Sequence, residues 1–218
     1  MPVSAAERNS LFGDAPLALL YSGNFGRAHG YHDLLNLAER LVGPGGRLVF
    51  SVRGNRVTEL REAVRQKNIP VQFVPFTNEN KLLDRLACAD IHVVSLQADW
   101  TGAVLPSKFF GALAAGRPVL FSGSSQCSIA MWIHEHKVGW VVTAENADEV
   151  ALQLIEYIRS PQSVAAMQQR CAEVYRKNFS RVVQLDRWDR RLRSLLDPSR
   201  SPTSAKSQDP SLTPAPRL

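Results

Sequence analysis

The chain has 218 residues and a mass of 24.2 kDa, which suits one domain or one domain with tails. Hydrophobic residues make up 44% and charged residues 21%, which supports a packed core and excludes a wholly disordered or fibrous chain. The net charge is +6, but residues 1–169 hold equal numbers of basic and acidic residues. Residues 170–196 hold eight basic and three acidic residues. This uneven distribution argues against a uniformly basic nucleic-acid-binding domain, so no nucleic acid is expected as a partner.

The N-terminus lacks the basic start and apolar run of a signal peptide, and no apolar run approaches the ~18–20 residues of a membrane span. Cys88, Cys127 and Cys171 are widely spaced and form no CxxC pair, so they indicate free thiols in a reducing compartment. We therefore expect a cytoplasmic protein. We also expect that it requires no metal ion and no organic cofactor.

Short apolar runs alternate with amphipathic stretches between residues 17 and 159. The runs lack strict polar alternation, as strands do when both faces of a sheet are covered. The predicted strands are Leu17–Tyr21, Arg47–Val52, Val71–Val74, Ile91–Leu96, Pro118–Phe121 and Gly139–Val142. The helices predicted between them are Tyr31–Val42, Arg56–Lys67, Lys81–Cys88, Lys108–Ala115 and Ser128–His136. This alternation predicts an α/β fold, a Rossmann-like parallel sheet of about six strands with helices on both faces.

From residue 147 onward the pattern is helical only. The predicted helices are Ala147–Arg159, Pro161–Asn178 and Arg181–Leu196, the second of them beginning with an N-cap serine followed by proline. Residues 197–218 contain five prolines and five serines and few large apolar groups, which predicts a disordered tail. We therefore place a ligand-binding domain at 17–160, C-terminal helices at 161–196 and the tail at 197–218.

The loop after the first strand is a candidate phosphate site, because ligands of open parallel sheets bind beyond the carboxyl ends of the strands. Its glycines permit positive φ and let backbone N–H groups approach an anion. The candidate residues are Gly23, Asn24, Gly26, Arg27 and His29. A tight turn without a ligand explains the same glycines equally well. The loop lacks the G-x-G-x-x-G pattern, and no acidic residue follows the second strand, which argues against a nicotinamide dinucleotide.

The loop after the fourth strand ends in Pro-Ser-Lys at the start of a helix. Ser107 and Lys108 place a hydroxyl and an ammonium there, which favours an anion site over a solvated lysine. Asp90 and Asp99 are the only carboxylates that we expect to be well placed at strand ends. The sequence shows no nucleophile–base pair and no paired acids, so we name no catalytic residue.

Three segments carry a family resemblance: Ser-Gly-Asn-Phe-Gly-Arg-Ala-His-Gly at 22–30, Cys-Ala-Asp-Ile-His-Val-Val-Ser-Leu at 88–96 and Leu-Pro-Ser-Lys-Phe-Phe-Gly-Ala-Leu-Ala-Ala-Gly-Arg-Pro-Val at 105–119. In this order they resemble the C-terminal, donor-binding half of GT-B retaining glycosyltransferases. The Pro-Ser-Lys segment points to the family-4 branch of polysaccharide and lipopolysaccharide assembly. The resemblance covers about residues 1–195, and it implies that residues 1–16 are the linker between two GT-B domains.

The resemblance also implies a role for each loop. The first loop would approach the donor diphosphate, and Phe76 and Thr77 would lie near the nucleotide base. Donor sugar and phosphate would contact Gly102, Ala103, Val104, Ser107, Lys108 and Gly111. The chain departs from the family at Asn24 and His29, where an arginine and a lysine are frequent, and at Ala103 and Gly111, where two glutamates are frequent. The usual ribose contact is therefore absent.

The function implied is the sugar-nucleotide-binding half of a glycosyltransferase of cell-surface polysaccharide or glycolipid synthesis. Such a half needs an acceptor-binding domain or subunit, against which Arg181–Leu196 would cross, and it is expected to be inactive alone. The alternative is a non-catalytic, degenerate domain or gene remnant that serves at most as an interaction module. The arginines of 181–196 suggest contact with anionic lipids at the inner membrane face, although a solvated helix side explains them equally well.

Overall fold

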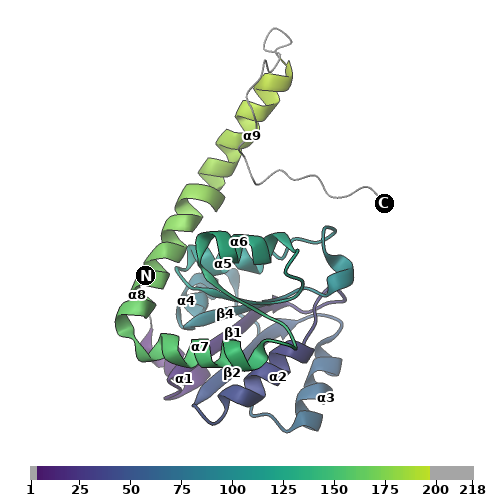
Figure 1. Cartoon of the computed structure of the whole chain (residues 1–218), viewed down its shortest axis with the longest axis vertical. Helices are drawn as coiled ribbons and strands as arrows, with labels where there is room; N and C mark the ends of the chain where they lie inside the picture. The colour runs from purple at the N-terminus through teal and green to yellow at the C-terminus, as the bar shows by residue number, and fades with distance from the viewer. Residues whose placement is uncertain (1–3, 197–218) are drawn as a thin grey trace.

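The chain folds around one six-stranded sheet in which every strand pairs in parallel with its neighbours (Figure 1). The computed structural model describes residues 4–196, and the tail predicted over 197–218 lies outside these residues. The strands are β1 Leu17–Asn24, β2 Gly46–Arg53, β3 Gln72–Val74, β4 Ile91–Ser95, β5 Val119–Ser122 and β6 Gly139–Val142. Their order is β3-β2-β1-β4-β5-β6, which confirms the predicted Rossmann-like sheet.

Helices cover both faces of this sheet. One face is covered by α2 His32–Leu41, α3 Val57–Lys67 and α7 Ala147–Arg159. The other is covered by α1 Ala5–Phe12, α4 Leu82–Ala87, α5 Lys108–Ala114 and α6 Ser128–His136. Helix α8, Pro161–Val174, contacts both α7 and α5 and so joins the two faces. Short 3-10 turns lie at Glu79–Lys81 and Ala98–Trp100. Figure 1 shows α5 and α6 on one side of the strands and α7 and α2 on the other.

The central strand β1 shows why the strands lack polar alternation. Leu17, Leu19 and Tyr21 belong to the core on the α2 side, whereas Ala18 and Leu20 belong to the core on the α1 side. Successive side chains of a strand point to opposite faces, so both sets must be apolar when both faces are covered. Each fully buried leucine contributes about 1.5–3 kcal/mol relative to an exposed one. Cys88, Cys127 and Cys171 are free and buried in these cores, as their spacing indicated.

At their carboxyl ends, β1 runs three residues and β2 one residue beyond the predicted strand limits. Ser22, Gly23 and Asn24 pair in register with Ser51, Val52 and Arg53. These extra pairs are held by the backbone ladder and carry no apolar side-chain signal, so sequence periodicity does not detect them. The extension carries the loop after β1 outward, beyond the carboxyl edge of the sheet.

The helix α1 was not indicated by the sequence pattern, because it is only weakly amphipathic. It begins at the N-cap Ser4, whose hydroxyl accepts a hydrogen bond from the Glu7 backbone N–H at 3.3 Å. Leu11 and Phe12 are buried, and Arg8 forms an ion pair with Asp90 at 3.0 Å. Tertiary contacts therefore hold a helix within the segment that the resemblance assigned to a linker.

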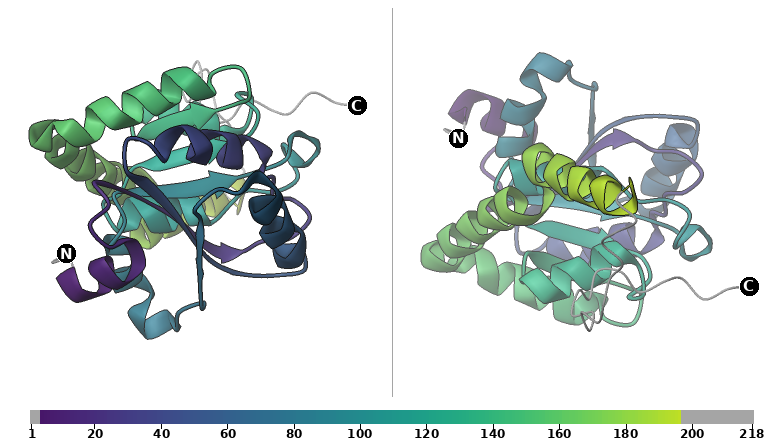
Figure 2. Two further views of the ribbon diagram at one scale, coloured as in Figure 1. Left: turned by 90° about the horizontal axis from the view of Figure 1, so that it is seen from below. Right: turned by 90° about the horizontal axis from the view of Figure 1, so that it is seen from above.

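The helix predicted over 161–178 ends early and passes through a π-helical turn at Tyr175–Phe179. This turn places the centre of the Phe179 ring 5.0 Å from the ring centre of Trp132 and 5.7 Å from that of Phe109, in an aromatic cluster between α5 and α6. Helix α9, Arg181–Leu196, then runs away from the body of the domain (Figure 1) and lies in front of it when the molecule is seen from above (Figure 2, right). Its Trp188 is 63% exposed.

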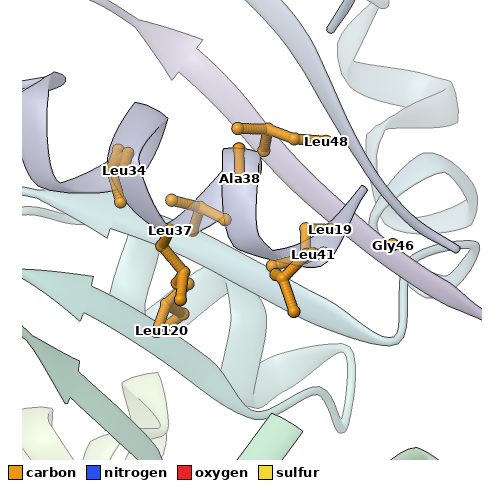
Figure 3. A pocket seen from close by; sticks show the side chains of 9 residues that line it. Leu19, Leu34, Leu37, Ala38, Leu41, Gly46, Leu48 and Leu120 are labelled. Carbon is orange, nitrogen blue, oxygen red and sulfur yellow. The ribbon is translucent and has the colours of Figure 1, made fainter. Parts of the chain in front are cut away.

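A small apolar cavity lies between α2 and the sheet (Figure 3). Its lining consists of Gly46 and aliphatic side chains, among them Leu19, Leu37 and Leu120. The volume of the cavity is about 10 Å³. That space holds at most about one water molecule, and its apolar walls offer a water no side-chain partner. The cavity is therefore a packing gap and not a ligand site.

Candidate functional site

The candidate site lies at the carboxyl edge of the sheet, where β1 and β4 are neighbours. The helix after β1 packs on one face of the sheet and the helix after β4 packs on the other, so the two loops separate here. Such a switch in strand order opens the crevice in which α/β proteins bind ligands. Below the crevice, Gln97 joins the loops by donating its backbone N–H to Ala28 O at 2.8 Å.

The first half of the loop after β1 is anchored on the end of β2. The backbone N–H of Phe25 donates to Arg53 O at 2.7 Å, and the Phe25 carbonyl accepts from the Arg56 backbone N–H at 3.3 Å. The loop passes so close to Gly54 that a Cβ there would lie 2.4 Å from the Phe25 oxygen. Gly54 also has a φ of +132°, which only glycine adopts without strain. This turn therefore fixes the path of the loop.

The second half of the loop is held by Arg56 and Glu59. The Arg56 guanidinium donates to His29 O at 2.8 Å and forms an ion pair with Glu59, which also accepts from the Tyr31 hydroxyl at 3.0 Å. Hydrogen bonding from Arg56 lowers the pKa of Glu59 to about 2, so this carboxylate stays charged at neutral pH. Both ends of the glycine-rich loop are thus fixed without a ligand.

The side chain of His29 is buried under the loop, between the strands and α5. Its Nδ1 lies 2.8 Å from Ser95 O and its Nε2 lies 3.4 Å from the ammonium of Lys108. Burial lowers the pKa of His29, and the nearby charge of Lys108 lowers it further. The imidazole is therefore neutral at pH 7.

Lys108 is the first residue of α5, and its side chain crosses the carboxyl edge toward β1. A Cβ on Gly23 would lie 2.8 Å from Lys108 Cε, so the lysine stem fills the space above this glycine. The ammonium lies 5.2 Å from the centre of the Tyr21 ring. Among the side chains described in residues 4–196, no carboxylate lies within ion-pair distance of Lys108. Burial lowers the pKa of Lys108 to about 8.

Of the other residues predicted in the first loop, only Gly23 lies against the Lys108 side chain. Gly23 has a φ of +130°, and Gly26 lies beside the Asn24 side chain. Asn24 is exposed at the end of β1, and its amide oxygen lies against Gly54. Arg27 is exposed, with no hydrogen bond or ion pair from its side chain among the described residues. The structure therefore brings Gly23, His29 and Lys108 together and leaves Arg27 free to reach solvent.

The residues predicted in the second loop line its outer surface. Gly102, with a φ of +84°, and Ala103 are exposed, and Val104 is half-buried. Ser107 is exposed and its hydroxyl makes no capping hydrogen bond. Gly111 lies one turn into α5, where a Cβ would contact Leu86 of α4 at 3.6 Å.

Beyond β2 and β3 an aromatic side chain is paired with a cation. The guanidinium of Arg53 lies 4.7 Å from the centre of the Phe76 ring, and Thr77 beside it is buried. Phe76 and Thr77 were predicted here, whereas Arg53 was missed as a site residue. The signal available was its position as the last residue of β2, on the same edge as the glycine loop.

The expectation that Asp90 is well placed at a ligand-binding strand end is wrong. Asp90 directly precedes β4 and so lies at the amino edge of the sheet, where it accepts hydrogen bonds from Arg8 Nη2 at 3.0 Å and the Ala18 backbone N–H at 2.8 Å. At the carboxyl edge the sequence reasoning missed Asp33, whose carboxylate lies 3.5 Å from Ser122 Oγ. Burial raises the pKa of Asp33. It sits in the first turn of α2 and was read only as part of an amphipathic helix.

Within residues 4–196 no group of three or more His, Cys, Asp or Glu side chains is arranged to hold a metal ion. In the same part of the chain, no helix is both long and apolar enough to span a membrane.

Residues 4–177 match the sequence profile of the family described as "Glycosyl transferases group 1". The chain belongs to this glycosyl transferase family. WcaI of Escherichia coli (strain K12), assigned to colanic acid biosynthesis as a glycosyl transferase, is 32% identical over 115 residues, 51% of this chain and 28% of WcaI. WbjE of Pseudomonas aeruginosa, assigned as a glycosyltransferase, is 24% identical over 192 residues, 83% of this chain and 45% of WbjE. The chain therefore spans less than half the length of either relative.

The fold of this glycosyl transferase domain also matches solved structures. HepE of Anabaena in complex with UDP-glucose superposes with a TM-score of 0.64 at 19% identity, over 88% of this chain and 54% of that chain. At this identity the likeness shows the fold alone, which is the Rossmann-like half of a GT-B structure.

Proposed function

We propose that this glycosyl transferase domain binds a nucleoside-diphosphate sugar, and specifically a UDP-sugar, for the assembly of a cell-surface polysaccharide or glycolipid. The family match and the assignment of WcaI to colanic acid biosynthesis support the reaction class and its setting. The UDP-glucose in the HepE structure supports the choice of nucleotide. The site requires no metal ion in this proposal, because lysine and backbone N–H groups supply the positive charge for the diphosphate.

The observation that carries the proposal is the position of the Lys108 ammonium. Lys108 is half-buried, and even partial burial of a cation without an opposite charge is unfavourable, so such an arrangement is typical of a site where a ligand supplies the missing charge. The ammonium lies at the switch point of the strand order, beside glycine backbone that an anion can approach closely. A donor diphosphate fits this combination. As the sugar leaves, negative charge grows on the diphosphate, and a cation fixed in advance stabilises it.

The remaining candidates divide between the two ends of the donor. Arg53 and Phe76 offer a cation and an aromatic face beyond β2 and β3, where we place the nucleotide base. The exposed backbone at Gly102 and Ala103, with the free hydroxyl of Ser107, faces the position of the donor sugar.

Transfer in this proposal requires an acceptor-binding domain or subunit, which docks on α9. The chain spans less than half the length of WcaI and WbjE, and α9 extends from the body of the domain (Figure 1). Leu185, Trp188, Leu192 and Leu195 recur at spacings of three and four and are 51–65% exposed. Such a stripe on one helix side is typical of a surface that packs against a partner.

The basic side of the same helix gives a secondary proposal, a weak contact with an anionic membrane surface. Arg190 and Arg193 are paired with Asp186 and Asp189, so the attraction rests mainly on the other arginines of the helix. Each basic residue near such a surface contributes about 1 kcal/mol. Co-sedimentation with phosphatidylglycerol vesicles, compared with phosphatidylcholine vesicles, tests the contact. Equal binding to both would contradict it.

The donor proposal is tested by titrating the full chain with UDP-glucose in a calorimeter, beside the variant Lys108→Met. Methionine keeps most of the stem volume and removes only the charge. We expect saturable binding by the wild-type chain and a loss of at least tenfold in the variant. Equal affinities would remove Lys108 from the site.

A degenerate, non-binding domain is the second candidate, and Asn24 is the observation that favours it. This amide lies where a cation is frequent in the family, and it packs on backbone at Gly26 and Gly54. A folded chain that binds none of UDP-glucose, UDP or GDP would support this candidate.

A further inference from the structure

We infer that His29 is a positioning residue, which holds the Lys108 ammonium in place for the donor and does not bind the donor itself. The inference rests on the proposed donor-binding function. It changes the role predicted for His29, because the sequence suggested a direct contact with phosphate.

The hydrogen bonds of the imidazole fix its tautomer. The carbonyl of Ser95 only accepts, so the His29 Nδ1 at 2.8 Å must carry the hydrogen that it donates. In the neutral ring Nε2 then has a lone pair and accepts. The Lys108 ammonium, 3.4 Å away, donates to this lone pair. A carbonyl on β4 therefore sets which ring nitrogen faces the lysine.

His29 has no nitrogen left for a phosphate. Both ring nitrogens are engaged within the protein, and only 8% of the residue is exposed. The ring is packed among aromatic neighbours, with its centre 5.8 Å from Phe25 and 6.1 Å from Tyr21. Burial and the charge of Lys108 both disfavour the imidazolium, so the ring does not become a second cation at neutral pH.

Lys108 retains the capacity that His29 lacks. An ammonium has three N–H donors, and among the described residues His29 is its only hydrogen-bond partner. Two donors remain for an anion at the carboxyl edge. The lysine stem is confined by Gly23 below it, so the contact with His29 fixes a side chain whose position is already restricted. A flexible lysine loses rotamer freedom on binding an anion, and fixing it beforehand removes that loss.

Two substitutions distinguish the contact of His29 with Lys108 from its contact with Ser95, which anchors the loop. His29→Asn places an amide near the position of Nδ1, so it can still donate to Ser95 O, but it has no acceptor for Lys108. His29→Gln reaches the position of Nε2 and offers an oxygen to Lys108, but it loses the bond to Ser95. We expect UDP-glucose affinity to fall about tenfold in His29→Asn and to be largely restored in His29→Gln.

The decisive measurement is a double-mutant cycle in the full chain, with UDP-glucose as the titrant. If His29 acts through Lys108, His29→Asn lowers affinity in the wild-type background and has no further effect when added to Lys108→Met. Equal losses in both backgrounds, or a loss in His29→Gln and none in His29→Asn, would overturn the inference and leave His29 as a loop anchor. Urea unfolding of each variant identifies any that fails to fold. A wild-type chain that binds no UDP-glucose would instead refute the proposed function.

Discussion

Raising the pH from 7 to 9 should weaken the binding of UDP-glucose about tenfold, because Lys108 loses its charge in this range. Burial lowers the pKa of Lys108 to about 8. About nine-tenths of the molecules then carry the ammonium at pH 7 and about one-tenth at pH 9. Only the charged form attracts the diphosphate, so the apparent Kd rises as the charged fraction falls. The bound anion raises the pKa of Lys108, and binding above pH 8 is therefore accompanied by proton uptake.

Calorimetric titrations with UDP-glucose at pH 7, 8 and 9 measure this effect directly. The matched control is Lys108→Arg, whose guanidinium stays charged over the whole range. The affinity of Lys108→Arg for UDP-glucose can differ from that of the wild type. Only the change of its affinity with pH matters, because that change reports any titration of the ligand itself. A flat wild-type profile, or one parallel to that of Lys108→Arg, would refute the assignment of Lys108 as the titrating cation.

Three further substitutions test the account. Lys108→Met should raise the free energy of unfolding by about 1 kcal/mol at pH 7, because it removes a half-buried charge that has no opposite charge beside it, and a less stable variant in urea would contradict this. Asp90→Ala should lower it by about 2–4 kcal/mol, since it leaves Arg8 unpaired, yet change UDP-glucose affinity less than twofold. A larger change in affinity would mean that the amino edge contributes to the site. Gly54→Ala should destabilise the chain by about 2–4 kcal/mol and weaken the binding of UDP-glucose, because its Cβ would collide with the Phe25 carbonyl. Unfolding followed by circular dichroism measures this stability. A variant as stable as the wild type would show that the turn does not fix the loop.

The fold was predictable because covered strands and amphipathic helices leave strong local patterns. The strand β5 was predicted at 118–121 and lies at Val119–Ser122, and the predicted helices 128–136 and 147–159 match α6 and α7. The α1 helix was missed although Ser4 and Glu7 have the spacing of a helix start, because its weak amphipathic pattern gave no further signal and contacts with distant residues such as Asp90 hold it. The π-helical turn before α9 was missed for a similar reason, because it places Phe179 in an aromatic cluster from α5 and α6.

The candidate site was predictable as a set of loops but not as a set of contacts. The glycines at 23 and 26 and the Pro-Ser-Lys segment each indicated an anion site locally. The two loops form one site only because β1 pairs with β4, which brings Lys108 next to His29, 79 residues earlier in the chain. Asp90 was a different kind of error, because the predicted strand already began at Ile91 and so placed Asp90 at its amino end, away from the edge where parallel sheets bind ligands.

The location and identity of the ligand are tested most directly by following the backbone amide resonances of the full chain by NMR during a titration with UDP-glucose. We predict saturable shifts for the amides of Gly23, Gly26 and Gly102 at the carboxyl edge, and none for Gly46 at the amino edge. The same titration with NAD should leave all four unchanged. Shifts centred on Gly46, equal responses to NAD, or no response from the folded chain would contradict the assignment of this edge as a sugar-nucleotide site.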